Sequence, residues 1–373
     1  MTSVRKRLAL LRGLWNGRVA FDGPHWVTFY ITRRCNLKCP WCRYHSDNFP
    51  KLSDSARSSP LDFPLDLFSR TCEELKAAGV NTVVINGEGE PTMHPNFLGF
   101  LVEARNLGLQ TIVFSNGTTL DETLARELVE SGLTRLRVSL WCASTDGYAR
   151  NYPGADPSNF DRITAGLKRL RQIKLEKKSR FPLVSIHHPI TRANFQEVQT
   201  MVSVAQDCRI DYLSFGPFKH YGQEDHSLRM SSEEETRARE VLQRMRSQLD
   251  AKAISHNISD TLQRYEMADR VLDYVPCYIG WLHACIRMDG RVRACNQCDE
   301  TLGDLNRQTF GAIWNDRPFQ EFRRQMMTDG SAAAAQYCCD CDYCCHLTHN
   351  TRVHRIARWF PWFSFRRAHA PKD

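Results

Sequence analysis

Three cysteines near the N-terminus form the most specific chemical motif of the chain. Residues 32–42 read TRRCNLKCPWC, which spaces Cys35, Cys39 and Cys42 four and three residues apart. Three thiolates on one short loop suit three irons of a cubane iron–sulfur cluster, and the fourth iron then has no protein ligand. An open iron can chelate the amino and carboxylate groups of a small molecule while the cluster passes it one electron. The alternatives are a zinc site completed by His45 and three thiols without a metal.

A second group of cysteines follows in the C-terminal third, where residues 277–345 contain nine of the fifteen in the chain. Five of the nine belong to the run CCDCDYCC at residues 338–345. Clustered thiolates in a reducing cytosol bind metal more often than they pair as disulfides. A zinc site built from two Cys-x2-Cys pairs and thiols without a metal are two of the possibilities. These pairs are Cys295 with Cys298 and Cys341 with Cys344.

Both groups need a scaffold, and short β-rich runs alternate with amphipathic helical patterns from Trp26 to about Phe215. The expected strands are Trp26–Ile31, Val80–Asn86, Gln110–Ser115, Arg135–Leu140, Leu183–His187 and Tyr212–Gly216. The expected helices include Pro64–Ala78, Asn96–Leu107, Glu122–Ser131, Ser158–Leu175 and Asn194–Ala205. Six strand-then-helix units predict an α/β fold, a partial (β/α)6 TIM-type barrel with its chemistry in the loops after the strands. Ser231–Arg264 is expected to be helical throughout, and Met288–Arg291 to form a hairpin turn.

The cysteine loop lies directly after the first expected strand, and Trp41 precedes its last cysteine. In this it resembles the radical S-adenosylmethionine superfamily, whose hallmark is Cys-x3-Cys-x2-Cys. The resemblance implies a [4Fe-4S] cluster that reductively cleaves S-adenosylmethionine to methionine and a 5′-deoxyadenosyl radical. That radical would take hydrogen from an unactivated C–H bond. A low-potential electron donor such as flavodoxin or ferredoxin is implied as a partner.

The loop after the second strand, residues 86–91, reads NGEGEP and looks like the superfamily's Gly-Gly-Glu-Pro loop. In the superfamily this loop holds the methionine amino group of the cofactor. Glu88 replaces the first glycine, so the resemblance assigns that role only to Gly89 and Glu90. An ordinary turn is the alternative.

Two further loops carry residues that match superfamily positions. Asn116 belongs to a turn similar to Thr-Asn-Gly at the end of the third strand. Ser139 and Arg150 match a serine on the fourth strand and an arginine about eleven residues later, which contact the ribose or carboxylate of the cofactor. Trp141 replaces the acid that often follows this serine. For Arg150, a solvated surface arginine is the alternative.

The C-terminal cysteines resemble the SPASM and twitch extensions of the superfamily, which hold one or two auxiliary [4Fe-4S] clusters. The first half of that pattern, Cys277-x12-Gly290-x4-Cys295, is present, whereas the longer Cys-x5-Cys-x3-Cys tail is missing. One auxiliary cluster is therefore expected rather than two. The expected ligands are Cys277, Cys295, Cys338, Cys341 and Cys344.

No catalytic acid or base can be assigned. His187 and His188 are adjacent at the end of the fifth strand, where alternation points them in opposite directions, so at most one faces the barrel mouth. A packed or solvated histidine is the preferred interpretation of each.

The chain is basic mainly at its ends. Residues 1–23 carry a net charge of +4 and residues 352–373 of +5, so the body carries −1 of the total of +8. Nucleic-acid binding is therefore not expected, and no run of roughly 18 uncharged apolar residues predicts a membrane-spanning helix. No secretory signal is present, which favours the cytoplasm. Both ends combine large apolar residues with arginines, a pattern that suits an anionic membrane surface, a partner protein or docking on the barrel. Docking is the preferred interpretation.

These observations divide the chain into five segments. They are a basic amphipathic segment (1–24), a partial barrel (25–230), a helical closing segment (231–265), an auxiliary-cluster domain (266–349) and a basic aromatic tail (350–373). The predicted function is a radical S-adenosylmethionine enzyme of oxidoreductase or epimerase type acting on a small molecule such as a sugar or polysaccharide precursor. Only about 24 residues precede the first strand, too few for the leader-peptide-binding domain of many peptide maturases. A peptide-modifying maturase and a non-catalytic zinc-bearing scaffold are the alternatives.

Overall fold

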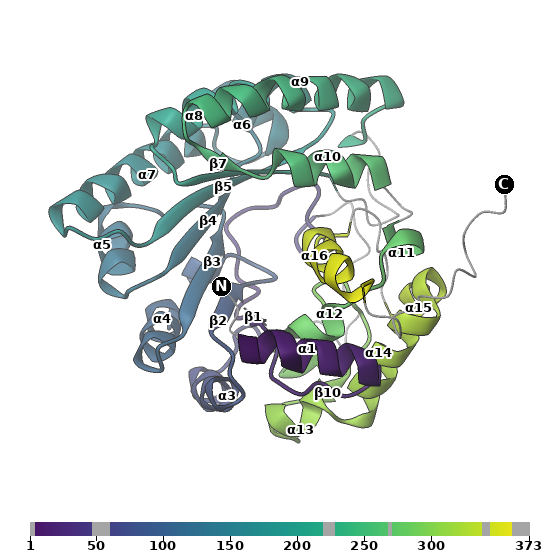
Figure 1. The fold of residues 1–373 in the computed structure, drawn as a ribbon. Helices are drawn as coiled ribbons and strands as arrows, with labels where there is room; N and C mark the ends of the chain where they lie inside the picture. The colour runs from purple at the N-terminus through teal and green to yellow at the C-terminus, as the bar shows by residue number, and fades with distance from the viewer. Residues whose placement is uncertain (1–3, 47–59, 219–227, 268–270, 338–343, 360–373) are drawn as a thin grey trace.

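A curved sheet of parallel strands organises the molecule (Figure 1). The computed structural model describes residues 4–46, 60–218, 228–267, 271–337 and 344–359. The first six strands are β1 (Trp26–Tyr30), β2 (Thr82–Asn86), β3 (Gln110–Ser115), β4 (Arg135–Ser139), β5 (Leu183–Ile190) and β6 (Tyr212–Pro217). Each is hydrogen-bonded in parallel to the next. This confirms the predicted α/β fold with a partial barrel, and the sheet does not close within the described residues.

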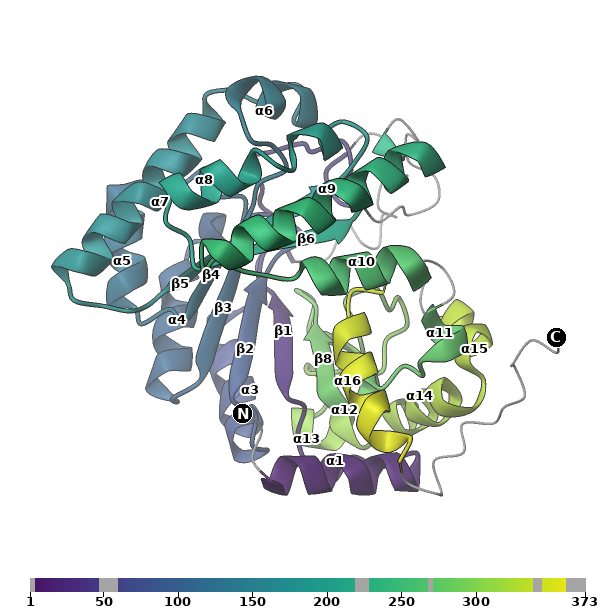
Figure 2. The same ribbon diagram turned by 45° about the horizontal axis from the view of Figure 1, so that its top comes forward.

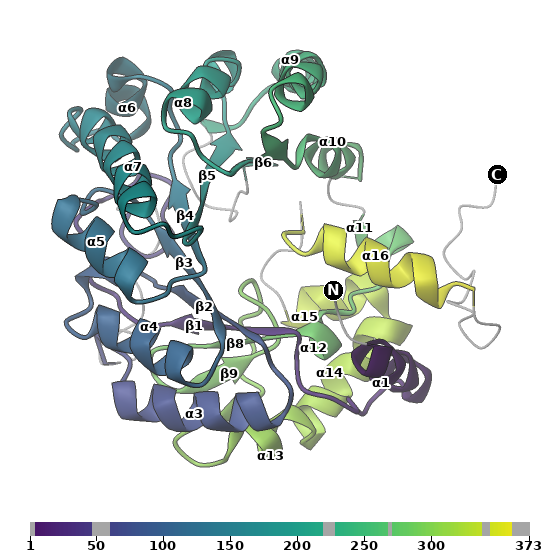
Figure 3. The same ribbon diagram turned by 60° about the vertical axis from the view of Figure 1, so that its left-hand side comes forward.

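Helices cover the convex side of this sheet (Figure 3). They are α3 (Leu65–Ala77), α4 (Phe97–Asn106), α5 (Glu122–Glu130), α6 (Thr145–Asn151), α7 (Asn159–Glu176), α8 (Met201–Asp207) and α9 (Ser232–Ala251). Each helix buries one apolar stripe; in α3 the stripe is Phe68, Cys72 and Leu75, which repeat at helical spacing and are fully shielded from solvent. The concave side of the sheet faces the C-terminal helices.

The expectation that residues 231–264 are helical throughout is wrong. After α9, Ala253 adopts a positive φ of 53°, and β7 (Ser255–His256) adds a seventh parallel strand beside β6. The side chain of Asn257 accepts from the Phe215 amide at 2.8 Å and donates to the Phe215 carbonyl at 2.7 Å, which completes the pairing. Helix α10 (Ile258–Met267) then begins.

The expected helix at residues 194–205 is also only partly formed. The structure has a short 3-10 turn, η2 (Phe195–Glu197), before α8 begins at Met201. Asn194 is diverted from helix formation because its side chain accepts from the Thr191 amide at 2.8 Å. A second such turn, η1 (Pro91–Met93), follows β2.

The C-terminal region extends the same sheet from its other edge. Strand β8 (His283–Ile286) pairs in parallel with β1, although more than 250 residues separate them. Strand β9 (Arg291–Arg293) pairs antiparallel with β8, and Gly290 closes the predicted hairpin with a φ of 81°. The remaining elements are β10 (Gly303–Asp304), α11 (Val271–Tyr274), α12 (Ile279–Leu282), α13 (Phe310–Trp314), α14 (Arg317–Thr328), α15 (Gly330–Tyr337) and α16 (Leu347–Ala357).

The N-terminal helix α1 (Val4–Asn16) docks on this C-terminal region (Figures 1 and 2). Gly13 lies so close to the Trp281 ring that a Cβ would be 2.9 Å from it. The fully buried Arg323 of α14 reinforces the contact, because its guanidinium donates to the carbonyls of Arg18, Gly280 and Trp314 at 2.6–3.0 Å. The Arg323 side chain thus joins the N-terminal segment to the C-terminal region through hydrogen bonds to backbone carbonyls.

Candidate iron–sulfur and substrate site

The three cysteines of the N-terminal loop lie at the carboxyl edge of the parallel sheet, directly after β1. The start of the loop is anchored by Asp62, whose carboxylate accepts from the Thr32 hydroxyl at 2.6 Å and from the Arg34 guanidinium at 2.8 Å. The amide of Cys42 donates to the carbonyl of Cys39 at 2.9 Å, which folds the loop back on itself. This anchoring presents three free thiols from one compact turn.

The thiols of Cys35, Cys39 and Cys42 are partly buried and electrostatically coupled. Burial raises the pKa of each, and the neighbouring Cys42 and Cys35 raise the pKa of the Cys39 thiol further. Three adjacent thiolates are unfavourable without a cation, and a bound metal would stabilise them. The donors are soft sulfur atoms of the kind that holds iron–sulfur clusters, so the residues present fit the predicted cluster.

The loop after β2 lies directly against the cysteine loop. A Cβ on Gly89 would lie 2.1 Å from the carbonyl oxygen of Arg34, so only glycine permits this approach. The amide of Gly89 donates to the Thr32 carbonyl at 3.0 Å, and the amide of Glu90 donates to the Arg34 carbonyl at 2.7 Å. The structure thus places Gly89 and Glu90 beside the cysteines.

The carboxylate of Glu90 is buried and accepts several hydrogen bonds. Its oxygens accept from the hydroxyls of Thr92 and Ser115, both at 2.8 Å, and from the amide of Asn116 at 2.6 Å. Burial raises its pKa, while these donors oppose that shift. The Asn116 side chain in turn donates to Asn36 of the cysteine loop at 2.9 Å. Glu90 and Asn116 therefore connect the ends of β2 and β3 to the loop.

Ser139 and Arg150 differ in their surroundings. Ser139 lies on the same face of β4 as Arg137, toward the concave side. Arg150, on α6, forms an ion pair with Glu197, so its guanidinium is already partnered. Trp141, which lies between these two residues in the sequence, stacks on Trp41 of the cysteine loop with ring centroids 4.0 Å apart and ring planes 11° apart. Trp141, which replaces the acid of the superfamily motif, thus packs against the cysteine loop.

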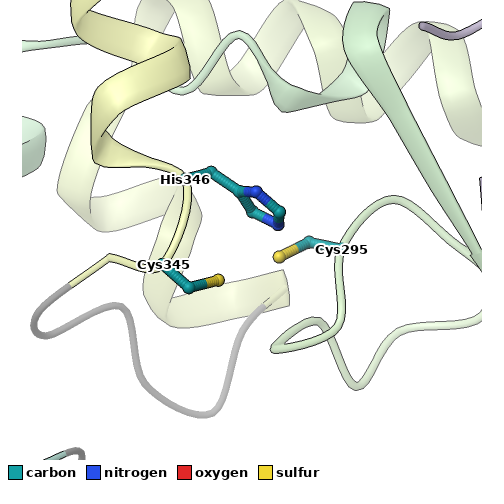
Figure 4. A group of neighbouring side chains, drawn as sticks. All are labelled: Cys295, Cys345 and His346. Atoms are coloured by element: carbon teal, nitrogen blue, oxygen red, sulfur yellow. The ribbon is translucent and has the colours of Figure 1, made fainter. Parts of the chain in front are cut away.

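A second group of metal-ligating side chains faces this region. The ligand atoms of Cys295, Cys345 and His346 lie within 4.8 Å of one another and converge from the loop after β9 and the segment before α16 (Figure 4). Cys295 was predicted as a ligand, whereas Cys345 and His346 were not. Their position at the end of the cysteine-rich run was the available signal, but the superfamily spacing did not include them.

Of the other four predicted auxiliary ligands, the structure describes two, Cys344 and Cys277. Cys344 adjoins Cys345 and contributes to the raised pKa of the Cys295 thiol, whose main cause is Cys345. Asn350 links Cys344 to the chain beside Cys277, because it accepts from the Tyr278 amide at 2.9 Å and lies 4.0 Å from the Cys344 sulfur. The last two predicted ligands, Cys338 and Cys341, lie outside the described residues.

Cys298, which the zinc alternative pairs with Cys295, points elsewhere. Its buried thiol donates to the Tyr337 carbonyl at 3.1 Å. Among the described residues it does not join the Cys295 group.

Two cavities, called upper and lower below, adjoin the C-terminal group of cysteines and share part of their lining. The upper cavity, about 320 Å³, is lined by Cys42 and Trp141 on one side and by Cys345 on the other. The lower cavity, about 500 Å³, lies among the inward-facing side chains of β1 to β6. His187 and Cys345 line both. His188 instead points into the opposite core, where its Nδ1 donates to the Leu140 carbonyl at 2.9 Å, as the alternation predicts.

Glu88, which departs from the superfamily motif, joins the loop after β2 to the C-terminal hairpin. Its buried carboxylate pairs with Arg33 at 2.9 Å and with Arg287, which follows β8. Arg287 also donates to the Tyr44 hydroxyl at 3.0 Å and lies 4.5 Å from the Tyr30 ring centre. The sequence showed that Glu88 replaces a glycine of the superfamily motif, but it did not show that Glu88 pairs with Arg287.

Comparison with protein families assigns both halves of the chain. The radical SAM superfamily model matches residues 29–203, and the SPASM model, described as an iron–sulfur cluster-binding domain, matches residues 277–342. This chain contains a radical SAM domain and a SPASM domain. Both predicted resemblances are confirmed, and with them the predicted cofactors at the level of the two domains: a radical SAM cluster with S-adenosylmethionine, and auxiliary iron–sulfur ligation.

Individual relatives are distant in sequence. An AdoMet-dependent heme synthase from Methanosarcina barkeri is 23% identical over 333 residues, 85% of this chain and 89% of that relative. A PqqA peptide cyclase from Bradyrhizobium diazoefficiens is 25% identical over 206 residues, 54% of this chain and 48% of that relative. These relatives differ from one another in what their names say they act on.

Solved structures share the fold. SuiB from Streptococcus suis, bound to S-adenosylmethionine, superposes with a TM-score of 0.65 at 16% identity, covering 92% of this chain and 77% of SuiB. The structure of anSMEcpe with bound AdoMet superposes with a TM-score of 0.62 at 15% identity, covering 90% of this chain and 98% of that chain. At this identity the likeness concerns the fold alone.

Proposed function

We propose that this protein cleaves S-adenosylmethionine reductively and removes hydrogen from a C–H bond of a small molecule bound between its two cysteine groups. The observation that carries the proposal is the upper cavity, which Cys42 of the N-terminal loop and Cys345 of the C-terminal group line together. A substrate in this cavity would touch both sites. Oxidation or epimerisation of that substrate is the proposed reaction type.

The cluster and S-adenosylmethionine, when bound, supply a carbon-centred radical at the cost of one electron from a donor such as flavodoxin or ferredoxin. Cys35, Cys39 and Cys42 would hold the cluster. Gly89 allows the loop after β2 to approach, and Glu90 and Asn116 fix that loop to the cysteines through the hydrogen bonds described above. Ser139 and Arg150 are proposed as further cofactor contacts, and Arg150 would have to leave Glu197 to act.

The aromatic side chains of the upper cavity exclude water from the reacting atoms. Trp41 and Trp141 stack, and Phe218 packs edge-on against Trp141 with ring centroids 5.7 Å apart. Radical intermediates are protected from side reactions when an active site is dry. The chain's contribution is therefore to hold one C–H bond in place and keep solvent away.

A small-molecule substrate is supported by the cavities themselves. Volumes of about 320 and 500 Å³ are in the range of small-molecule sites. Peptide modification is the second candidate, because one sequence relative is named a peptide cyclase. The zinc-bearing scaffold is disfavoured, since Cys298 does not join Cys295.

Release of 5′-deoxyadenosine tests the proposed function. Anaerobically reconstituted protein given S-adenosylmethionine and a reductant is expected to release it, because cleavage needs only the N-terminal cluster. Cys39→Ala is expected to lose more than 99% of this release, whereas Cys208→Ala, a buried cysteine outside both groups, should retain it. An intact cluster without any 5′-deoxyadenosine would refute the proposal.

We also propose that α1 contacts an anionic membrane surface. Val4, Leu8 and Trp15 are 73%, 62% and 68% exposed, and helical spacing places them within about 40° of one another on one face. Arg5, Arg7 and Arg12 flank that face, and the opposite face docks on the protein. No described helix is long and apolar enough to span a bilayer, so the contact would be peripheral. The predicted contribution of the C-terminal aromatic run falls on residues 360–373, outside the described part of the chain.

A further inference from the structure

The lower cavity is strongly cationic, although the body of the chain carries a net charge near zero. Arg135, Arg137 and Arg264 line it and supply its positive charge. Four histidines also line it, and burial lowers the pKa of three of them, His25, His187 and His349, which disfavours their charged form. No aspartate or glutamate is among the described residues that line either cavity. Positive charge is therefore concentrated where a ligand would lie.

The guanidinium of Arg137 is held in place without a carboxylate. Its Nη2 donates to the Ser214 hydroxyl at 2.7 Å and lies 3.1 Å from Nδ1 of His187. Its Nε is shielded from solvent and has no hydrogen-bond partner. Burial lowers the pKa of Arg137 to about 10, and the nearby charges of Arg264 and Arg135 contribute to this shift. These effects indicate three cations close to one another.

Arg264 and Arg135 also lack a counter-charge within the described chain. Arg264, from α10, donates through Nη2 to the Cys345 carbonyl at 3.4 Å, and its Nε is likewise buried without a partner. Neither forms an ion pair with a described carboxylate. Other arginines near the site do: Arg33 and Arg287 pair with Glu88, and Arg150 pairs with Glu197.

Buried cations without a counter-ion are unfavourable, and proteins normally pair them. The fork of a guanidinium suits carboxylate and phosphate oxygens, which it binds through two parallel hydrogen bonds. Arg135, Arg137 and Arg264 present three such groups to the lower cavity, with no carboxylate among the described residues that line it.

We propose that the substrate of this protein carries an oxyanion, a carboxylate or a phosphate, that binds to Arg135, Arg137 and Arg264 in the lower cavity. The reacting carbon then extends into the upper cavity, between Cys42 and Cys345. The inference rests on the proposed function for its second half, but the anion site stands on the cavity alone.

Three small probes test the anion site directly. Inorganic phosphate, succinate and succinamide are titrated into the reconstituted protein by calorimetry. Succinamide has nearly the shape of succinate but no charge. At least one anion is expected to bind at least about tenfold more tightly than succinamide, and binding should weaken as salt increases. Phosphate alone, succinate alone or both would identify the oxyanion class.

Two substitutions assign the site. Arg264→Gln and Arg135→Gln are each expected to weaken binding of the anion about tenfold or more, since each removes a charge-assisted contact. Arg162→Gln removes an exposed arginine on α7 that pairs with Asp156, and it should leave binding unchanged. The use of two cavity variants covers the case in which one does not fold, which circular dichroism would reveal.

Absence of any preference for an anion over succinamide would overturn the proposal. So would anion binding that both cavity variants retain at the strength of the Arg162→Gln control. The proposed function has a separate test in 5′-deoxyadenosine release by the unsubstituted protein without probes. Arginine-dependent anion binding in a protein that releases no 5′-deoxyadenosine would retain the anion site and reject the radical chemistry.

Discussion

Single side chains decide which metal the C-terminal group can hold. Cys295, Cys345 and His346 present two sulfurs and one imidazole nitrogen to the same point. Nitrogen ligation of an iron–sulfur cluster raises its reduction potential relative to thiolate ligation. If His346 is a ligand, the auxiliary site is electronically different from one held by four cysteines.

We predict that Cys295→Ser lowers the iron content by about four atoms per chain, one cubane cluster. Cys298→Ser, three residues away, should keep its iron because that thiol donates to the Tyr337 carbonyl. Iron and acid-labile sulfide assays on anaerobic protein provide the measurement. Equal iron in both variants would exclude Cys295 as a ligand.

His346 is tested by exchange of the ligand atom. We expect His346→Ala to lose auxiliary iron and His346→Cys to retain it, because a thiolate can replace the imidazole. Pulsed electron paramagnetic resonance of the reduced wild type should show coupling to a nitrogen nucleus, and His346→Cys should lack it. Retention of the nitrogen coupling in His346→Cys would assign it to another residue.

Only part of the candidate site could be predicted from the sequence. The three N-terminal cysteines were identified because their spacing is local and specific. Cys345 and His346 were missed because their convergence on Cys295 depends on how α16 packs, about fifty residues along the chain. The arginines of the lower cavity that lack a described carboxylate partner could not be predicted either, because a sequence pattern does not show which charged side chains form ion pairs.

At the scale of elements, the ion pair of Glu88 with Arg287 joins the loop after β2 to the hairpin of β8 and β9. We predict that Glu88→Gln lowers the free energy of unfolding by about 3 kcal/mol, because it leaves two largely buried guanidinium groups without their carboxylate. Urea denaturation provides the measurement.

The matched control is Glu122→Gln, which breaks the exposed ion pairs of Glu122 on α5 with Arg126 of the same helix and Arg169 of α7. Its effect on stability should be much smaller, since solvent screens exposed charges. A double variant, Glu88→Gln with Arg287→Met, should recover part of the loss because the orphaned charge is removed. Equal effects at Glu88 and Glu122 would contradict a structural role for the buried pair.

Local elements were largely predictable, and long-range pairing was not. The first six strands follow from apolar runs separated by amphipathic segments, and their order follows from right-handed crossover connections. Strand β7 was not predicted because it has only two residues and lies within a segment whose pattern is helical. The Asn257 side chain, which accepts from the Phe215 amide, supports its pairing with β6. Strand β8 was missed because nothing in its four residues specifies β1 as its neighbour.

At the scale of the whole molecule, α1 combines two faces with different roles. Its inner face, with Gly13 and Leu14, packs on the C-terminal region, and its outer face exposes Leu8 and Trp15 between arginines. We predict that the protein sediments with phosphatidylglycerol vesicles at low salt and less with phosphatidylcholine vesicles, because cations flank the apolar stripe.

Trp15→Asp is expected to lower this vesicle binding about tenfold or more, since it removes an interfacial ring and adds a repelled charge. Leu175→Asp, an equivalent change at an exposed leucine of α7, should have little effect. Indistinguishable sedimentation of the two variants would mean that α1 is not the contact.

The pairing of β8 with β1 makes the two domains interdependent in folding. A truncation that ends after Met267 would convert β1 into a sheet edge with unsatisfied backbone donors and acceptors along an apolar strand. Such edges recruit strands from other molecules. We therefore expect the isolated barrel fragment to aggregate during expression, so the N-terminal cysteine site is best studied in a chain that retains β8.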